Sequence, residues 1–157
     1  MHGDVIPQRR VADPLLVDAV RLLLGIRVMG DGRSEEQLLV RLLCAAAGWD
    51  GFPFESQVDA REARKAAGER MALMGNLNNP SLLWQGTPED VYKACWDLMD
   101  AGVDGLAPEG SVPLVTKKEP LMAIARAARD WSAMHRGDDG VVHRPDPSTS
   151  TYPGYPG

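Results

Sequence analysis

Residues 71–91, MALMGNLNNPSLLWQGTPEDV, decide the fold of this chain. The apolar run 71–74 predicts a strand. The Gly, Asn and Pro residues at 75–80 predict a turn, because proline restricts the residue before it and lacks an N–H. One apolar turn follows at 81–84. The Thr-Pro-Glu-Asp sequence at 87–90 then predicts a helix start, with threonine as the N-cap, proline at the first position and carboxylates at the positive helix end.

The same alternation of strands and helices extends in both directions from this stretch. Strands are expected at 26–29, 50–55, 71–74 and 103–107. Helices are expected, from capping residues and apolar spacing, at 14–24, 35–47, 58–67, 88–101 and 120–134. A helix followed by four strand–helix units predicts an α/β chain with a parallel sheet and right-handed crossovers. Trp84 and Trp96 fall at helical positions and are expected to pack in the core.

The composition limits the class of protein. The chain has 157 residues, of which 44% are hydrophobic and 25% charged, and this predicts one folded domain. A net charge of −5 at pH 7, with no basic cluster, argues against nucleic acid as a partner. No apolar run approaches the ~18 residues of a membrane span, and the first residues lack the layout of a signal peptide. Cys44 and Cys95 are expected as buried thiols in the cytoplasm.

Three segments differ in composition. Residues 1–12 show no periodicity and are expected to be loose. Residues 13–136 contain the strand–helix units and form the expected domain. Residues 137–157 combine acidic residues, prolines and a Ser-Thr-Ser-Thr run at 148–151, a composition that cannot build a core. They are therefore expected to be a disordered tail.

Polar residues follow the expected strands at the point where each strand ends. In parallel α/β folds, ligands lie beyond the carboxyl ends of the strands. The candidate substrate-binding residues are therefore Asp31, Glu55, Asn76, Asn78, Glu109 and Ser111. Carboxylates gathered at one edge suit acid–base chemistry or cation binding. The alternative is structural, with Asp31 in a turn and Asn76 in a left-handed turn, and no catalytic residue is assigned.

Two segments resemble a known family. The pattern GNxNxPxxxWxGTPEDV at 75–91 and the segment DAGVDGLAPEGSVPL at 100–114 look like the last two strand units of the uroporphyrinogen decarboxylase superfamily. The branch they most resemble is the cobalamin-dependent methyltransferases, which move a methyl group from a corrinoid to a thiol such as coenzyme M. The resemblance extends over roughly residues 25 to 131.

Members of this superfamily fold as TIM (β/α)8 barrels, which usually need about 250 residues. The resemblance therefore implies that this chain is the C-terminal half of such a barrel. A half-barrel exposes strand edges, so the chain is expected to form a homo- or hetero-oligomer. Three explanations stay open: two copies associate, a separately encoded N-terminal barrel half completes the fold, or the chain is a gene fragment.

The zinc-dependent methyltransferases of this family carry His-x-Cys after the strand that corresponds to 26–29, and a third ligand, cysteine, after the last strand. The resemblance places Met29, Asp31 and Gly110 at those positions, while Cys44 falls inside an expected helix. Zinc in those enzymes binds the thiol and makes a thiolate nucleophile. This chain is therefore expected to bind no metal, and no cofactor in isolation.

The resemblance implies methyl transfer from methylcobalamin to a thiol in corrinoid-dependent one-carbon metabolism. Methylcobalamin is then a substrate, and the expected partner is a corrinoid protein or an N-terminal barrel half. Whether the chain is an enzyme by itself stays open, because the zinc ligands are missing. The first alternative is a non-catalytic barrel half or a subunit that binds a corrinoid protein. The second is uroporphyrinogen decarboxylation in tetrapyrrole biosynthesis, although the arginine-rich N-terminal half of those enzymes is not matched.

Overall fold

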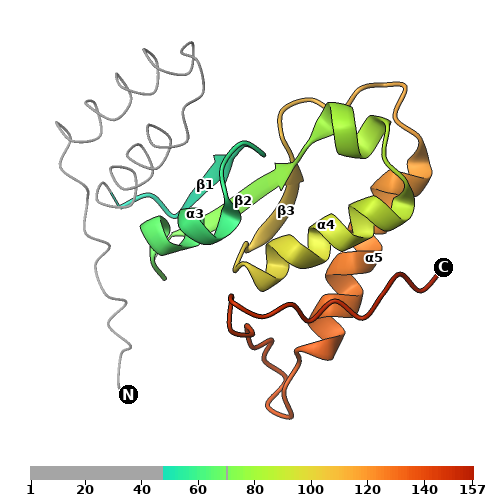
Figure 1. Ribbon diagram of the computed structural model, residues 1–157. Helices are drawn as coiled ribbons and strands as arrows, with labels where there is room; N and C mark the ends of the chain where they lie inside the picture. The colour runs from blue at the N-terminus through green and yellow to red at the C-terminus, as the bar shows by residue number, and fades with distance from the viewer. Residues whose placement is uncertain (1–47, 70) are drawn as a thin grey trace, which may run out of the picture.

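The computed structural model describes residues 48–69 and 71–157 (Figure 1). Its elements are β1 (Gly51–Phe54), α3 (Ala60–Ala67), β2 (Ala72–Leu77), the π-helical turn η1 (Asn79–Trp84), α4 (Pro88–Asp100), β3 (Gly105–Pro108) and α5 (Lys118–Met134). The expected α/β class is confirmed. The loose segment 1–12, the strand expected at 26–29 and the helices expected at 14–24 and 35–47 lie outside the described residues. Within the described part, no helix is long and apolar enough to cross a membrane.

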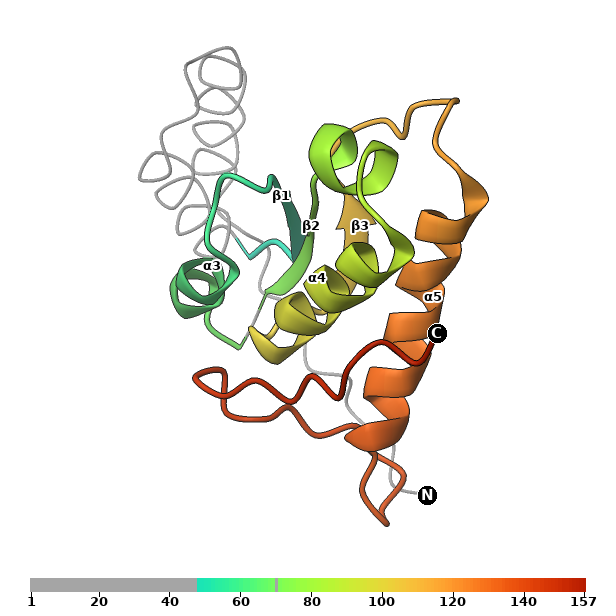
Figure 2. The same cartoon turned by 45° about the vertical axis from the view of Figure 1, so that its right-hand side comes forward.

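The described strands form a parallel sheet in the order β1-β2-β3. Ala72 of β2 pairs with Gly51 of β1, and Met74 of β2 pairs with Gly105 of β3. Right-handed crossovers place α3 and α4 on the same face of such a sheet, and Figure 2 shows both helices on that side, with α5 beside α4. Met74 points to the other face and is 47% exposed.

The central strand, β2, is longer than the sequence predicts. Gly75 and Asn76, which were expected to end it, remain in the sheet and pair with Leu106 and Ala107. Glycine is needed at this position, because a Cβ on Gly75 would lie 2.6 Å from the carbonyl oxygen of Phe54 in β1. Turn residues indicate a break through their local preferences, but pairing with a strand on each side overrides that preference.

The helix α4 begins where the sequence predicts. The Thr87 hydroxyl accepts a hydrogen bond from the backbone N–H of Asp90 (3.1 Å), and the Asp90 carboxylate accepts one from the backbone N–H of Thr87 (2.8 Å). Aspartate thus completes a capping box in which glutamate or glutamine is more usual. The hydrogen bonds from the Thr87 hydroxyl and then its backbone N–H lower the pKa of the Asp90 carboxyl.

Two apolar clusters lie between the helices and the sheet. The first joins α3 to β1 and β2 and contains Leu73. The second joins η1, α4 and α5 to the end of β2 and contains Leu77 and Trp96. Trp96 is fully buried, as expected, whereas Trp84 is 52% exposed, so its predicted core position is wrong. The buried apolar side chain of η1 is the preceding residue, Leu83, which leaves Trp84 facing outward.

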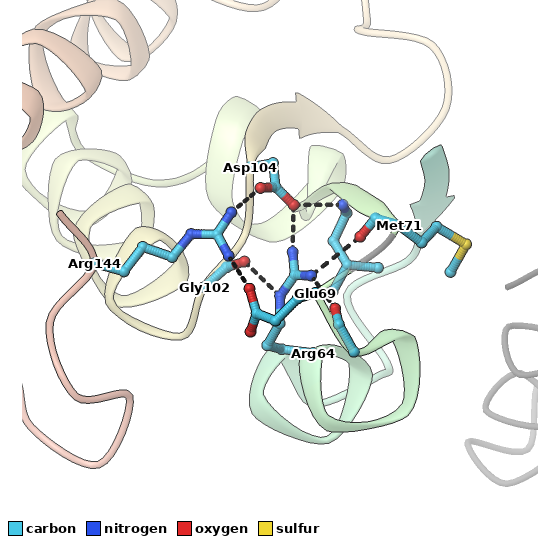
Figure 3. A network of polar contacts seen from close by, with 8 residues as sticks. Arg64, Glu69, Met71, Gly102, Asp104 and Arg144 are labelled. Atoms are coloured by element: carbon cyan, nitrogen blue, oxygen red, sulfur yellow. Dashed lines mark hydrogen bonds and ion pairs between the residues drawn. The ribbon is translucent and has the colours of Figure 1, made fainter. Parts of the chain in front are cut away.

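Arg64 of α3 organises the end of the sheet where the strands begin (Figure 3). Its Nε donates to the carbonyl of Gly102 (2.8 Å), and its Nη1 donates to the carbonyl of Met71 (3.1 Å). Its Nη2 forms an ion pair with Asp104, which also accepts a hydrogen bond from the backbone N–H of Leu73 (2.7 Å). One guanidinium thus satisfies carbonyl groups that precede both β2 and β3, as its several donors allow.

Residues 137–157, named the C-terminal strap below, differ from the expected disordered tail. They form an irregular segment that lies along α4 and α5 (Figures 1 and 2). Thr151 hydrogen-bonds to Asp100 of α4, and Tyr152 and Tyr155 pack against the second apolar cluster. Composition predicts disorder because few aliphatic residues are present. In the structure, one threonine and two tyrosines of this segment instead contact the helices.

Candidate functional site

The carboxyl ends of β1, β2 and β3 lie at one edge of the sheet, as the parallel arrangement predicts (Figure 1). The segments that leave this edge are named the strand-end loops. Asp31, one of the predicted site residues, lies outside the described residues. The structure places the others at this edge: Glu55 after β1, Asn76 near the end of β2, Asn78 after β2, and Glu109 and Ser111 after β3.

Glu109 connects the three strand-end loops through its carboxylate. Its Oε2 accepts a 2.7 Å hydrogen bond from the backbone N–H of Ser56, after β1. Its Oε1 accepts a hydrogen bond from the side-chain amide of Asn78, after β2. The same amide donates to the Ser56 hydroxyl at 3.0 Å. Hydrogen bonds to an ionised acceptor are stronger than neutral ones, so this carboxylate fixes the loops relative to one another.

Asn78 has a second role, at the start of η1. Its Oδ1 accepts a 2.8 Å hydrogen bond from the backbone N–H of Ser81, which makes Asn78 the N-cap of that turn. Its amide nitrogen meanwhile donates to Glu109. An aspartate here would keep the cap but would place a second negative charge against Glu109. Asparagine is therefore the residue that serves both contacts.

Asn79 is a site residue that the sequence analysis missed. It is 6% exposed, and its Nδ2 donates to the backbone carbonyls of Glu109 and Ser111, the latter at 3.0 Å. Its Oδ1 is buried and has no hydrogen-bond partner within the described part of the chain. Buried polar atoms normally have a partner, which includes water. The available signal was its position beside Asn78, directly after a strand.

Asn76 shapes the strand-end loops by holding backbone. Its Nδ2 donates to the carbonyl of Glu55 (3.1 Å) and to the carbonyl of Val58 (3.0 Å), between β1 and α3. The left-handed turn considered for Asn76 is wrong, because among the described residues positive φ angles occur only at glycines. With both hydrogens of its amide engaged, Asn76 offers no free donor to a ligand.

Glu55 and Ser111 present free polar groups beside this network. Both residues are exposed, and neither the carboxylate nor the hydroxyl has a hydrogen-bond partner among the described residues. Gly110, which precedes Ser111, has a φ of 66°, and a Cβ built on it would meet nothing within 4 Å. A ligand can therefore approach the backbone of this loop closely, with Glu55 and Ser111 as the groups free to bind it.

The described residues do not fit a zinc ion. They hold no group of three or more His, Cys, Asp or Glu side chains placed to bind a metal. Gly110 supplies no ligand where the family resemblance places a cysteine. Cys95 is buried in α4, and burial raises the pKa of its thiol to about 12, whereas a metal ligand must be a thiolate. We therefore derive no reaction step through zinc from these residues.

The fold defines a parallel α/β protein with polar residues at the carboxyl ends of its strands, the edge at which proteins of this class bind their ligands. The sequence model of the uroporphyrinogen decarboxylase (URO-D) family matches residues 17–131. The chain belongs to this family, in agreement with the resemblance seen in the sequence.

The relatives of this chain include methyltransferases. It is 31% identical over 84 residues to the methylcobamide:CoM methyltransferase MtbA of Methanosarcina acetivorans, a match covering 54% of this chain and 24% of the relative. It is 29% identical over 133 residues to the methylcobamide:CoM methyltransferase MtaA of Methanosarcina barkeri, covering 76% of this chain and 39% of the relative.

Structural comparison agrees on the fold. A solved methyltransferase from Methanosarcina mazei is similar with a TM-score of 0.56 and 24% sequence identity, over 64% of this chain and 29% of that one. The chain thus spans less than half the length of each of these relatives, since the matches cover 24%, 39% and 29% of them.

Proposed function

We propose that this chain forms the last strand–helix units of a methyltransferase barrel and acts in methyl transfer from a methylcobamide to a thiol. The relatives named for methylcobamide:CoM methyl transfer support this proposal. The observation that carries it is the arrangement of the strand-end loops, in which Glu109 joins three loops and leaves Glu55 and Ser111 free beside them. Substrates of barrel enzymes bind at this edge, and a rigid polar support favours binding there.

The proposed reaction sets tasks for these residues. The thiol loses its proton, and its sulfur forms a bond to the methyl carbon. The carbon–cobalt bond breaks, and its electron pair stays on the corrinoid. The methylated corrinoid is a substrate in this reaction. Glu109 positions the loops. The Ser111 hydroxyl binds a polar group of the methyl acceptor, and the exposed Glu55 carboxylate accepts the thiol proton as a general base.

The proposal includes a partner that extends the sheet. Among the described strands, β3 pairs with β2 alone, which leaves its second edge without a described neighbour. Parallel sheets normally have their edges and both faces covered. Met74 adds an exposed apolar side chain on the face that the helices leave open. A protein with the strands of an N-terminal barrel half, or a second copy of the chain, would cover these surfaces.

A non-catalytic role is the second candidate. Both oxygens of the Glu109 carboxylate already accept protein hydrogen bonds, and the described residues lack a metal-binding cluster. Such a chain would complete a barrel or bind a corrinoid protein without contributing to the chemistry. Uroporphyrinogen decarboxylation, by contrast, is supported by the family description alone, since the two relatives above are methyltransferases.

The test is methyl transfer from methylcobalamin to coenzyme M, followed through the change in corrinoid absorbance when the methyl group leaves. The chain is assayed alone and mixed with a separately produced N-terminal part of a relative such as MtaA. We expect the mixture to be more active than either component, and we expect Glu55→Gln to lower its rate about tenfold or more. Glu62→Gln, on the exposed side of α3, is the matched control and should leave the rate unchanged.

Two outcomes would change the conclusion. Saturable binding of methylcobalamin without methyl transfer in any mixture would favour the non-catalytic role. Neither binding nor transfer, with a folded chain and a folded partner, would refute the methyltransferase proposal.

A further inference from the structure

The C-terminal strap lies beyond the part of the chain that matches the family, which ends at residue 131. It leaves α5 through an exposed hairpin, in which the N–H of Gly137 donates to the carbonyl of Val141 (2.8 Å). It then returns along α4 and α5 (Figure 2). The strap therefore lies outside the matched segment and packs on helices within it.

A buried carboxylate holds the strap in place. Asp100, the last residue of α4, is 1% exposed. The backbone N–H and the hydroxyl of Thr151 both donate to this carboxylate at 2.7 Å, to Oδ2 and Oδ1 respectively. The indole N–H of Trp131 donates to Oδ1 at 2.7 Å. Because an unpaired buried charge is costly, the two donors of Thr151 stabilise the docked strap.

Aromatic side chains surround this anchor. The indole N–H of Trp96 donates to the Thr151 hydroxyl (2.9 Å). The ring of Tyr155 lies edge-on to Tyr92 with centroids 5.4 Å apart, and Tyr152 lies edge-on to Trp96 at 6.2 Å. Edge-to-face pairs of this kind are a favoured aromatic geometry. The surface that carries the polar anchor and these rings is named the tail receptor and consists of Tyr92, Trp96, Asp100 and Trp131.

The segment bound to the tail receptor is irregular. Residues 151–155, Thr-Tyr-Pro-Gly-Tyr, have no regular secondary structure, and Pro153 and Gly154 between the tyrosines are exposed. Proline restricts the free conformations of such a segment, so that binding costs less conformational entropy. Aromatic-lined grooves that bind proline-rich peptides also benefit from this lower entropy cost.

We propose that the tail receptor is a peptide-binding site for a Thr-Tyr-Pro-Gly-Tyr segment, occupied in cis by residues 151–155. Recognition uses the two threonine donors to Asp100, the hydroxyl acceptor for the Trp96 indole, and the two tyrosine rings. None of these contacts requires the covalent link through the hairpin, so the same segment binds when it is supplied as a separate peptide. The site does not involve the strand-end loops and is independent of the proposed methyl transfer.

The experiment cuts the strap from the folded chain. A specific protease site replaces the exposed residues 138–139, and the cut fragment is expected to co-elute with the body in size-exclusion chromatography. A fluorescent peptide of residues 144–157 should then displace the fragment and bind at one saturable site. The same peptide with Thr151→Val should bind about tenfold more weakly or worse, because a donor to a buried carboxylate is lost.

Thr149→Val is the matched control peptide, because the Thr149 hydroxyl donates within the strap, to the carbonyl of Asp146 (2.7 Å). We expect its affinity to stay within about threefold of the unchanged peptide. Loss of the strap from a body that stays folded, together with no peptide binding up to millimolar concentration, would refute the proposal.

If the cut protein unfolds, the proposal is tested instead by hydrogen exchange in the uncut chain. Thr151→Val is then expected to speed hydrogen exchange of the Trp96 indole about tenfold relative to Thr149→Val, because its acceptor is lost. Equal protection of that indole in both variants would refute the proposal.

Discussion

The side-chain amide of Asn78 donates a hydrogen bond to the carboxylate of Glu109, across 31 positions of sequence. This contact joins the end of β2 to the end of β3, and the N–H of Ser56 adds the end of β1. Glu109 is therefore a positioning residue, whose carboxylate sets the spacing of three loops. An ionised carboxylate has about four lone-pair sites, so the same group can still accept a hydrogen bond from a ligand.

Glu109→Gln is expected to destabilise the fold by about 1.5–3 kcal/mol, because a neutral amide replaces a charged acceptor and turns an N–H group toward one of two donors. Chemical denaturation measures this change in the free energy of unfolding. Glu55→Gln is the matched control, since Glu55 is exposed without a described partner, and should change stability by less than about 0.5 kcal/mol. Equal effects would show that Glu109 does not organise the loops.

The capping box of α4 makes stability depend on pH. Hydrogen bonds from Thr87 hold the pKa of Asp90 below its ordinary value of 3.8. The stabilising contribution of the carboxylate is therefore fully present above that value and is lost as the pH falls through the lower pKa of the folded chain. Asp90→Asn should lower the melting temperature near neutral pH, and its difference from the unchanged chain should shrink below pH 3.8. A difference in melting temperature that stays the same above and below pH 3.8 would contradict the role of the Asp90 carboxylate in the capping box. Glu89→Gln is the control, because Glu89 lies in the same helical turn but is not part of the capping box.

Removal of the C-terminal strap should lower stability, whereas composition alone predicts no change. A chain that ends at Arg136 leaves the buried Asp100 with the Trp131 indole as its described donor. We expect the melting temperature to fall by about 5 °C or more. His143→Gln, in the exposed hairpin, should leave it within about 1 °C. An unchanged melting temperature after truncation would support the disordered interpretation of the tail.

The two tryptophans Trp84 and Trp96 should differ in their contribution to stability. Trp96 is fully buried in the second apolar cluster, so Trp96→Ala should cost about 3–5 kcal/mol. Trp84 is half exposed at the end of η1, and Trp84→Ala should cost less than about 1 kcal/mol. Urea unfolding of both variants measures the difference. A large loss from Trp84→Ala would indicate that another segment or partner covers this side chain.

Local signals predicted much of the fold. Thr87-Pro88 indicated the start of α4, because capping and a proline at the first position depend on neighbouring residues only. The alternation of strands and helices predicted a parallel sheet, and with it the meeting of Asn78 and Glu109 at one edge. Their hydrogen bond could not be predicted, because it depends on the register of β2 and β3 and on the path of two loops.

Docking and burial were less accessible to sequence reasoning. Thr151 anchors the strap because Asp100 is buried beside it, and nothing in the composition of the strap describes that helix surface. The same limit applies to Asn79, since an asparagine after a strand is common whether or not its amide supports a neighbouring loop. Trp84 was misjudged because the π-helical turn changes which side chain faces the core.

Arg64 and Asp104 secure the starts of β2 and β3 through contacts within the protein alone, at the end of the sheet opposite the strand-end loops (Figure 3). These contacts at the strand starts are thus separate from the exposed Glu55 and Ser111 at the carboxyl edge, a division that is common in barrels. Loop residues such as Glu55 and Ser111 are consequently free to diversify under selection. New ligand preferences could then arise on this scaffold by single substitutions, without a compensating change in the groups that keep it folded.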